Sequence, residues 1–457
     1  MASAQGSPQG DKGFSPSSTE VIRQDVLQKG FADVIVVLTR AVPIRIGKAS
    51  AAAAGGTAGL NVISKFESLT SSLATALPSD LLMCFESAYD QSISDSGVSL
   101  ALRSAAWKNQ PQIPIAEQVA PVQYLENLGI VLGSIGSTGL SGLQQHPLVK
   151  SFMPVRDLSL VHPTRIASAS PQRGVAWGLA RMNIPYLWQR GFDGKGIKIG
   201  HLDTGADGTH PALRGAFAAF WESNYIGRPL EVCPEPHDTD MHGTHTAGTL
   251  VGRDMNGSQM GAAPGAKVAS GIVIEGGRVT FRILAGLNWI LGQDVRVLSM
   301  SLGIPGVAEE FLDITKILRD RRILLVVAIG NEGPHTSRSP GNYAGVMSVG
   351  AMDENNQVAD FSSSEMAGDR IVPDLVAPGV HIVSCAPRNE YVSMDGTSMA
   401  APHVAGLAAL LFQAKPDATV DQIQEAIYSS CNRPATMAKE RANRGVPDSK
   451  LALEHLI

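Results

Sequence analysis

The chain has 457 residues, a hydrophobic content of 44%, a charged content of 17% and a formal net charge of -5. This length gives room for two or three domains, and the composition is that of an ordinary globular protein. The negative net charge provides no electrostatic basis for binding nucleic acid or an anionic membrane. The longest apolar runs, residues 323–329 and 405–412, are far too short to cross a bilayer. We therefore expect neither nucleic acid nor membrane as a partner.

The N-terminal segment is rich in Gly, Ser, Gln and Pro and lacks the apolar core of a secretory signal. We expect residues 1–30 to form a disordered tail. Without a signal peptide the protein is expected to be cytoplasmic as made, although export by a non-classical route is compatible with the sequence. The cysteines show no metal-type spacing, and we expect free thiols. A disulfide between Cys385 and either Cys233 or Cys431 stays open.

Residues 31–157 combine short apolar runs with helical patterns. The runs at 32–39, 129–132 and 149–155 favour strands, and 138–145 favours a helix. They predict a small α+β domain with a long insertion between residues 42 and 115. Within that insertion, 48–60 is Ala/Gly-rich, typical of a loop or weak helix, and 62–107 carries mixed helical signals.

A polar connector, residues 158–176, follows this small domain and contains no acidic side chain. We place the domain boundary there. From residue 177 to 457, apolar runs alternate with amphipathic stretches. Strands are predicted at 197–203, 268–274, 295–302, 323–329, 347–351 and 381–384, and helices at 280–291 and 307–321. This alternation predicts an α/β fold with a doubly wound, mostly parallel sheet and helices on both faces, in which sites gather at the carboxyl ends of strands.

The most informative stretch is residues 396–406, GTSMAAPHVAG. It begins a helix that is apolar on every side and is therefore expected to be buried, with Thr397 as its cap. The free N–H groups at its start would stabilise a developing oxyanion beside Ser398. The alternative is that a serine beside a helix start is only a cap. That alternative does not explain the small residues around it, which suggest close approach of other backbones.

Other polar motifs occur at or near predicted strand ends. Asp203 ends the strand in HLDTG, Asn331 follows another strand in AIGNEG, and His242 opens HGTHTAG. Each alone has a structural explanation. Jointly they supply acyl-transfer chemistry, with Ser398 as nucleophile, His242 as general base, Asp203 as the carboxylate that orients it and Asn331 as an oxyanion donor. His245 and His403 are expected to be packed residues.

These motifs resemble those of the subtilisin-like serine proteases, or subtilases, whose chain order is also Asp, His, Ser. The resemblance covers residues 177–427 and implies a serine endopeptidase that hydrolyses peptide bonds in protein or peptide substrates. Residues 140–152, LSGLQQHPLVKSF, are similar to the end of the subtilase propeptide, an inhibitor and folding aid. By this resemblance, 31–157 is an inhibitory propeptide, 158–176 a linker for autoprocessing, and the protein a zymogen.

The resemblance also suggests how a substrate is held. It implies that the strand containing Ser299, Ser301, Leu302 and Gly303 pairs with the substrate backbone, with Gly276 and Gly277 on the opposite wall. A substrate gripped in this way binds as an added strand, which favours extended segments.

Calcium is the metal that this family often carries as a structural ion. Asp254 and Asn256 lie in the corresponding loop, but they supply too few oxygens to define a Ca²⁺ site. We therefore assign no metal ligands and no cofactor for the chemistry.

Arg338 lies in the loop after Asn331, where subtilases form the floor of the pocket for the residue before the cleaved bond. A guanidinium there would favour Asp or Glu in the substrate; alternatively, Arg338 points into solvent. No acidic residue lies between Asp157 and Asp193, so an acid-specific enzyme would have to cut itself after Asp157 or leave its maturation to another protease. The motifs leave open a transpeptidase or macrocyclase on the same scaffold, and a catalytically inactive binding protein.

Overall fold

The computed structural model describes residues 16–39, 77–94, 120, 122–156, 158–224, 226–276 and 278–457. The chain divides into two compact units, Met1–Val155 and Arg156–Ile457. The Ala/Gly-rich stretch 48–60 and most of 62–107 lie outside the described residues.

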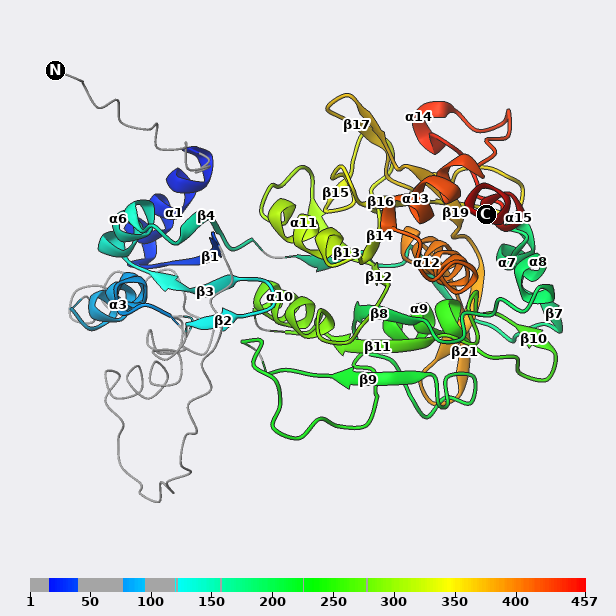
Figure 1. Cartoon of the computed structure of the whole chain (residues 1–457), viewed down its shortest axis with the longest axis horizontal. Coiled ribbons are helices and arrows are strands. Elements are labelled where there is room, and N and C mark those ends of the chain that lie inside the picture. The colour runs from blue at the N-terminus through cyan, green and yellow to red at the C-terminus, as the bar shows by residue number, and fades with distance from the viewer. Residues whose placement is uncertain are drawn as a thin grey trace. The chain divides into compact units, whose positions relative to one another are not determined.

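The first unit contains an antiparallel sheet in the order β2-β3-β1-β4. Its strands are β1 (Ala32–Leu38), β2 (Gln123–Leu125), β3 (Ile130–Ile135) and β4 (Val149–Pro154). The helices α1 (Pro16–Lys29), α3 (Ser79–Ser94) and α6 (Ser137–Gln145) pack against it (Figure 1).

The expectation of a disordered tail through residue 30 is wrong from Pro16 onward, where α1 begins. The side chain of Ile22 is fully buried and that of Val26 nearly so, and both belong to the hydrophobic core of the first unit. Their spacing of four residues forms one narrow apolar stripe on an otherwise polar helix. Packing against the sheet therefore stabilises a segment whose composition alone indicates disorder.

The second unit contains a sheet in the order β19-β16-β14-β12-β8-β11-β9, in which every neighbouring pair is parallel. The strands are β8 (Lys198–Asp203), β9 (Phe217–Trp221), β11 (Lys267–Ile272), β12 (Val297–Met300), β14 (Leu324–Ala328), β16 (Met347–Met352) and β19 (Leu375–Pro378). This confirms the predicted α/β fold. Because both faces of the sheet are covered, its strands are largely buried and mostly apolar, with a few buried polar residues such as His201 and Asp203.

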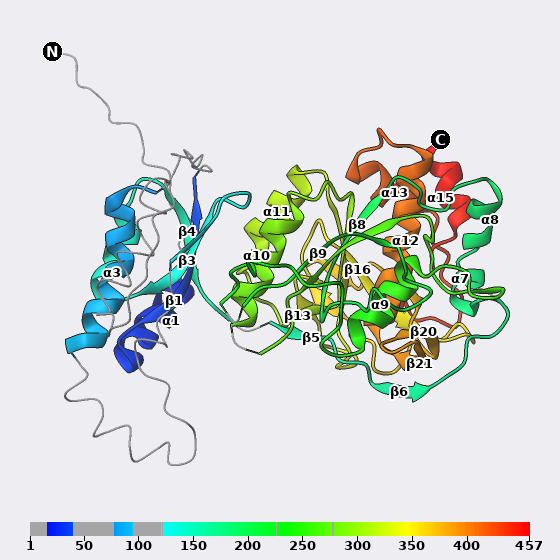
Figure 2. The same cartoon turned by 90° about the horizontal axis from the view of Figure 1, so that it is seen from below.

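Helices cover the two faces of this sheet (Figure 2). One face carries α9 (His242–Val251) and α12 (Thr397–Ala414), and the other α10 (Val279–Ile290) and α11 (Leu312–Asp320). Side chains alternate along β8: Ile199 belongs to the core under α12, whereas a Cβ at Gly200 would lie 3.2 Å from Ile290 of α10. His201 and Asp203 lie two and four residues after Ile199 on the same strand. Their side chains therefore emerge on the same face of the sheet, toward α9 and α12.

The helix α12 is buried from Thr397 to Phe412, as its all-round apolar sequence predicts. Its glycines allow close approach: a Cβ at Gly406 would lie 2.4 Å from the Cβ of Ala262. The same holds in α9, where a Cβ at Gly243 would lie 1.9 Å from the carbonyl oxygen of Gly205. The small residues in these motifs thus let two helix starts approach the carboxyl end of β8.

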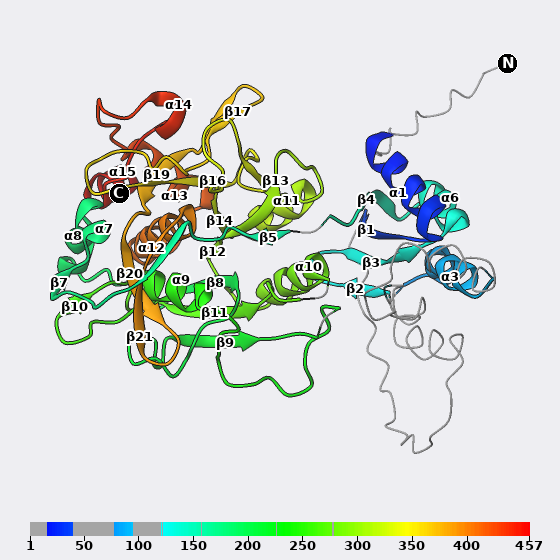
Figure 3. The ribbon, with the colours of Figure 1, turned by 180° about the vertical axis from the view of Figure 1, so that it is seen from behind.

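Strands run through the predicted polar connector, whose path is seen in Figure 3. Each of the three connector strands pairs with a different strand of the second unit. The strand β5 (Ser159–Leu160) pairs with β13 (Leu302–Pro305), and β6 (Arg165–Ser168) pairs with β21 (Glu390–Asp395). The strand β7 (Gly174–Val175) pairs with β10 (Ser258–Gln259). The connector therefore lies along the second unit and forms part of it.

The remaining elements surround this framework. They are α7 (Trp177–Arg181), α8 (Ile184–Gln189), α13 (Val420–Ser429), α14 (Lys439–Ala442), α15 (Ser449–Leu456), β15 (Arg338–Ser339), β17 (Glu365–Ala367), β18 (Arg370–Val372) and β20 (Ile382–Ala386). None of the described helices has the length and apolar character needed to cross a membrane. The cysteines are free thiols, as expected.

Candidate active site

Asp203 and His242 meet where β8 ends and α9 begins. The Nδ1 of His242 lies 2.8 Å from Oδ1 of Asp203, and the backbone N–H of Thr204 donates to the same oxygen at 2.8 Å. Both side chains are almost completely buried. Burial alone would raise the pKa of Asp203, but the charge of His242 and its hydrogen bond outweigh burial and hold that pKa below its ordinary value. Asp203 is therefore a carboxylate at neutral pH.

The interaction with Asp203 also changes the pKa of the His242 imidazole. Burial alone would lower the pKa of His242, but the carboxylate of Asp203 outweighs burial and raises it above its ordinary value. The other ring nitrogen, Nε2, is buried and has no hydrogen-bond partner among the described residues. The pair thus presents a ring nitrogen that can take up a proton.

Ser398 is the second residue of α12, and its side chain is fully buried. Its Oγ donates a hydrogen bond of 2.7 Å to the carbonyl oxygen of Val161, in the connector. The serine hydroxyl is therefore directed toward a peptide carbonyl.

Asn331 follows β14 and caps the start of α12. Its Oδ1 accepts hydrogen bonds of 2.9 Å from both the backbone N–H and the hydroxyl of Thr397. We expected Thr397 itself to cap this helix, but its side chain makes no capping bond and Asn331 does so instead. Because Oδ1 is engaged in this way, Nδ2 points outward and donates to the carbonyl oxygen of His162 at 2.8 Å.

The connector lies on β13 as an added antiparallel strand. Leu160 pairs with Leu302 and Ser159 with Gly303, and the N–H of Val161 donates to the carbonyl oxygen of Ser301 at 2.9 Å. Three of the predicted substrate-binding residues, Ser301, Leu302 and Gly303, therefore do hold an extended backbone.

A family model for the subtilase family matches residues 194–448, more than half of the chain. The chain belongs to the subtilase family. It is 37% identical over 256 residues to subtilisin BL of Lederbergia lenta, which covers 55% of this chain and 89% of that protein. It is 34% identical over 280 residues to the major intracellular serine protease of Bacillus subtilis, covering 59% and 86%. It is 32% identical over 308 residues to the thermostable alkaline protease of Halalkalibacterium halodurans, covering 67% and 78%. The protein is thus a subtilisin-like serine endopeptidase, a hydrolase.

Two other predicted substrate-binding residues of this subtilase, Ser299 and Gly276, do not pair with the connector. Ser299 lies in β12, inside the seven-stranded sheet, where its register partners are His201 and Val326. Gly276 lies in an exposed turn after β11, where its carbonyl oxygen is within 3.4 Å of an Arg282 nitrogen. Gly277 lies outside the described residues. In its sheet β5 is an edge strand, and its strand partner is β13.

Arg338 presents no free guanidinium, and it does not point into solvent either. Its Nη2 lies 2.5 Å from Oε1 of Glu332, while Nη1 donates to Oγ of Ser159 at 2.9 Å and to the carbonyl oxygen of Gly303 at 3.2 Å. Partial burial alone would raise the pKa of Glu332, but the hydrogen bond and charge of Arg338 outweigh it and lower that pKa. Since Glu332 matches its charge, the geometry of Arg338 gives no support to a preference for acidic substrate residues.

The two other histidines of the motifs are packed, as expected. Burial lowers the pKa of His245 to about 3 and that of His403 to about 4, so both are neutral at neutral pH. The Nε2 of His245 lies 2.9 Å from the carbonyl oxygen of Ile382, and Nδ1 of His403 lies 2.8 Å from that of Met399.

Asp238 is a supporting residue that the sequence reasoning missed. One carboxylate oxygen accepts from Thr204 Oγ1 at 2.7 Å, and the other from the N–H of Thr244 at 2.6 Å. Asp238 thereby ties the residue after Asp203 to the first turn of α9. The signal in the sequence was one of two nearby aspartates in a polar loop, Asp238 and Asp240, which does not distinguish such a role.

No metal centre is evident in this part of the molecule. Oδ1 of Asp254 accepts from the N–H of Gly257 at 2.7 Å and closes the turn around Asn256. Within the described ranges, no group of three or more His, Cys, Asp or Glu side chains has metal-binding geometry.

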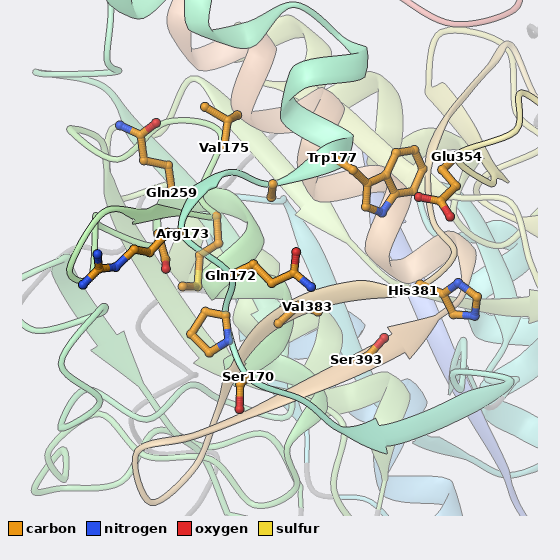
Figure 4. A pocket seen from close by; sticks show the side chains of 14 residues that line it. Ser170, Gln172, Arg173, Val175, Trp177, Gln259, Glu354, His381, Val383 and Ser393 are labelled. Carbon is orange, nitrogen blue, oxygen red and sulfur yellow. The ribbon is translucent and has the colours of Figure 1, made fainter.

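A separate cavity of about 410 Å³ lies beside the end of the connector. Figure 4 shows Trp177, Glu354 and His381 grouped on one side of it. The residues that line it include none of the candidate catalytic side chains. It is therefore not the candidate active site.

Proposed function

We propose that this subtilase hydrolyses peptide bonds in extended protein segments by acylation of Ser398, and that it is made as a zymogen. The observation that carries the proposal is the position of its own connector. Val161 lies on the edge of β13 as an added strand, with its carbonyl oxygen 2.7 Å from the hydroxyl of Ser398. An edge that takes a strand from the chain itself takes a similar strand from a substrate.

The proposed chemistry starts when Oγ of Ser398 leaves the carbonyl oxygen of Val161 and donates to Nε2 of His242, which has no hydrogen-bond partner among the described residues. His242 Nε2 takes the proton of Ser398 as Oγ attacks the carbonyl carbon, and Asp203 keeps the other proton on Nδ1 and stabilises the imidazolium. Asn331 Nδ2 and the N–H groups at the start of α12 hold the oxyanion. The intermediate collapses, the proton on His242 goes to the leaving amine, and water then hydrolyses the acyl-enzyme by the same steps.

The connector blocks the site in its present register. The hydroxyl of Ser398 bonds to the carbonyl of Val161, whereas Nδ2 of Asn331 bonds to the carbonyl of His162. Reaction requires one carbonyl to face both groups, so this strand is held without being well presented. Beyond the site the connector stays anchored by a 2.8 Å bond from the N–H of Thr164 to the carbonyl oxygen of Asp395. Residues 31–157 would then act as inhibitor and folding aid, by resemblance to the family's propeptide.

We expect slow self-cleavage between Val161 and His162. The reason is the backbone register: the N–H of Val161 bonds to Ser301 and its carbonyl meets Ser398, so this is the bond nearest to the nucleophile. N-terminal sequencing of the purified protein after incubation should find a chain that begins with His162. The Ser398→Ala chain should stay intact. A mature chain beginning at Leu158 would instead support the hypothesis of self-cleavage after Asp157, and it would contradict this register.

We expect Asn331→Leu to lower kcat by about 10²–10³-fold with little change in KM, because the amide donor acts on the oxyanion and not on the bound substrate. The substitution also removes the cap on Thr397. Asn331→Asp is the matched control, because it keeps an oxygen for that cap and loses the donor. Both variants should lose kcat, whereas Asn331→Leu should melt at the lower temperature. A rise in KM alone would mean that Asn331 only binds substrate.

Two other readings of the same residues are less well supported. A transpeptidase or macrocyclase would form the same acyl-enzyme and pass it to an amine, but the relatives named above are proteases. Incubation with a peptide and an excess of an amine nucleophile separates the two, since hydrolysis gives only free carboxylate products. A binding protein without catalysis has no need of the buried Asp203–His242 pair.

A further inference from the structure

Three buried polar side chains lie near the second carboxylate oxygen of Asp203, Oδ2, and the mechanism above does not use them. They are His201 on β8, Thr246 on α9 and Ser270 on β11. All three are at most 1% exposed. His201 and Asp203 are two residues apart on one strand, so their side chains emerge on the same face of the sheet.

The three side chains form a continuous chain of contacts to the carboxylate. Nδ1 of His201 lies 2.9 Å from Oγ of Ser270, and Nε2 lies 2.9 Å from Oγ1 of Thr246. The same Thr246 oxygen lies 3.4 Å from Oδ2 of Asp203. Oδ1 is already occupied by His242 and the N–H of Thr204. Among the described residues, Thr246 is the hydrogen-bond donor available to Oδ2.

The direction of these hydrogen bonds follows from the donors present. In the described part of the chain the hydroxyl of Ser270 has one hydrogen-bond partner, Nδ1 of His201, and donates to it. Burial lowers the pKa of His201, so the ring is neutral and carries its single proton on Nε2. That N–H donates to Thr246, whose own hydroxyl proton is left for an acceptor.

Thr246 has more than one acceptor within reach. The carbonyl oxygens of Gly243 and His242 lie 3.1 and 3.2 Å from its oxygen, closer than the carboxylate. A charged acceptor is the stronger one, and a donor bond from His201 polarises the hydroxyl further. The carboxylate also has no solvent to replace this bond, because Asp203 is buried. Both considerations favour Asp203.

We propose that His201, Thr246 and Ser270 are positioning residues for the hydrolytic reaction, forming a neutral hydrogen-bonded chain that fixes the second oxygen of Asp203. This inference rests on the proposed role of Asp203 and His242. The chain holds the carboxylate in the plane that His242 needs and stabilises its charge without adding a net charge. The carboxylate then orients the imidazole without binding the proton itself.

The test is Thr246→Val, which keeps the shape of the side chain and removes the hydroxyl. Activity is measured on a chromogenic peptide amide, with every variant cut in the connector by the same unrelated protease. We expect kcat to fall about tenfold, the lower end of what loss of a hydrogen bond to a charged group costs. KM should not change. The acid limb of the kcat/KM–pH profile should move to higher pH, because a less stabilised carboxylate holds the proton on His242 more strongly.

The charged and titratable groups near this pair must stay constant for the pH shift to be informative. They come from β8, from α9 and from the segment before α9, and are His201, His245, Asp238 and Asp240. Thr246→Val removes none of them. Ser270→Ala also removes none, and it should give a smaller change in the same direction because His201 loses the donor that fixes its tautomer.

Matched controls separate positioning from packing. Thr249→Val removes a buried hydroxyl from the same helix, which donates only to the carbonyl of His245, and it should leave kcat and the pH profile unchanged. Thr246→Ser should restore both. If Thr246→Val behaves like Thr249→Val while Ser398→Ala is inactive, the inference is wrong and the proposed function stands. If Ser398→Ala stays active, the proposed function itself fails.

Discussion

The Ser398→Ala variant should lose about six orders of magnitude in kcat. Loss of the nucleophilic serine has an effect of this size in subtilisin, a member of the same family. The fold should survive, because the hydroxyl makes one hydrogen bond, to the connector, and removal of one oxygen leaves the apolar packing of α12 unchanged. Hydrolysis of a peptide amide is measured after both chains are cut in the connector by the same unrelated protease.

Ser384→Ala is the matched control for that measurement. Ser384 is also fully buried, and its hydroxyl donates to the carbonyl oxygen of His245 at 2.8 Å without taking part in the proposed chemistry. It should retain activity within tenfold of the parent. Retention of more than a thousandth of the parent activity in Ser398→Ala would remove this serine from the nucleophile's role.

The second large effect is expected for Asp203→Asn, with a fall of about 10⁴-fold in kcat. The amide of an asparagine would place an N–H against Nδ1 of His242, which would move the ring proton to Nε2. In that tautomer the ring cannot accept the proton of Ser398. The melting temperature should also fall, because the amide nitrogen that faces His242 takes the place of Oδ1 and cannot accept the bond from the N–H of Thr204.

The pH profile of the same variant gives an independent reading. The carboxylate of Asp203 is what opposes the effect of burial and raises the pKa of His242. Without it that pKa must fall, so the neutral ring persists to lower pH. The acid limb of kcat/KM should therefore move to lower pH, opposite to the shift expected for Thr246→Val. A change in KM with kcat preserved would contradict the assigned role of Asp203.

The parts of this site that could be predicted from sequence are those fixed by side-chain identity and strand position. Asp203 and Asn331 follow short apolar runs that had to be buried strands, and the all-apolar α12 had to lie inside. In a parallel sheet such strand ends meet at one edge, so the residues come together.

The path of the connector could not be predicted in the same way. Its bonds to Ser301, Ser398 and Asn331 all use backbone atoms of Val161 and His162, and a polar sequence does not encode which edge its backbone will join. The hydrophobic pattern likewise does not indicate the break at Ser301. There the predicted strand 295–302 divides between β12 and β13.

The surroundings of Arg338 could not be predicted for a different reason. Its partner Glu332 lies six residues earlier in the same loop, and only the backbone path of that loop brings the two charges to 2.5 Å. A charge read from sequence without its partner predicts a free guanidinium. The helix α1 was not predicted because its apolar stripe, which includes Ile22, is too narrow to change the polar composition of the segment.

Covalent labelling with a serine-directed phosphonate tests the central claim most directly. After the connector has been cut, the protein should gain one adduct in its intact mass, and peptide mapping should locate it on Ser398. The rate of labelling should be much lower before the cut, because the hydroxyl of Ser398 then donates its hydrogen bond to the carbonyl oxygen of Val161, and the connector covers it. The Ser398→Ala and His242→Ala chains should not be labelled. An adduct on another serine, or none on a chain cut in the connector, would contradict the account.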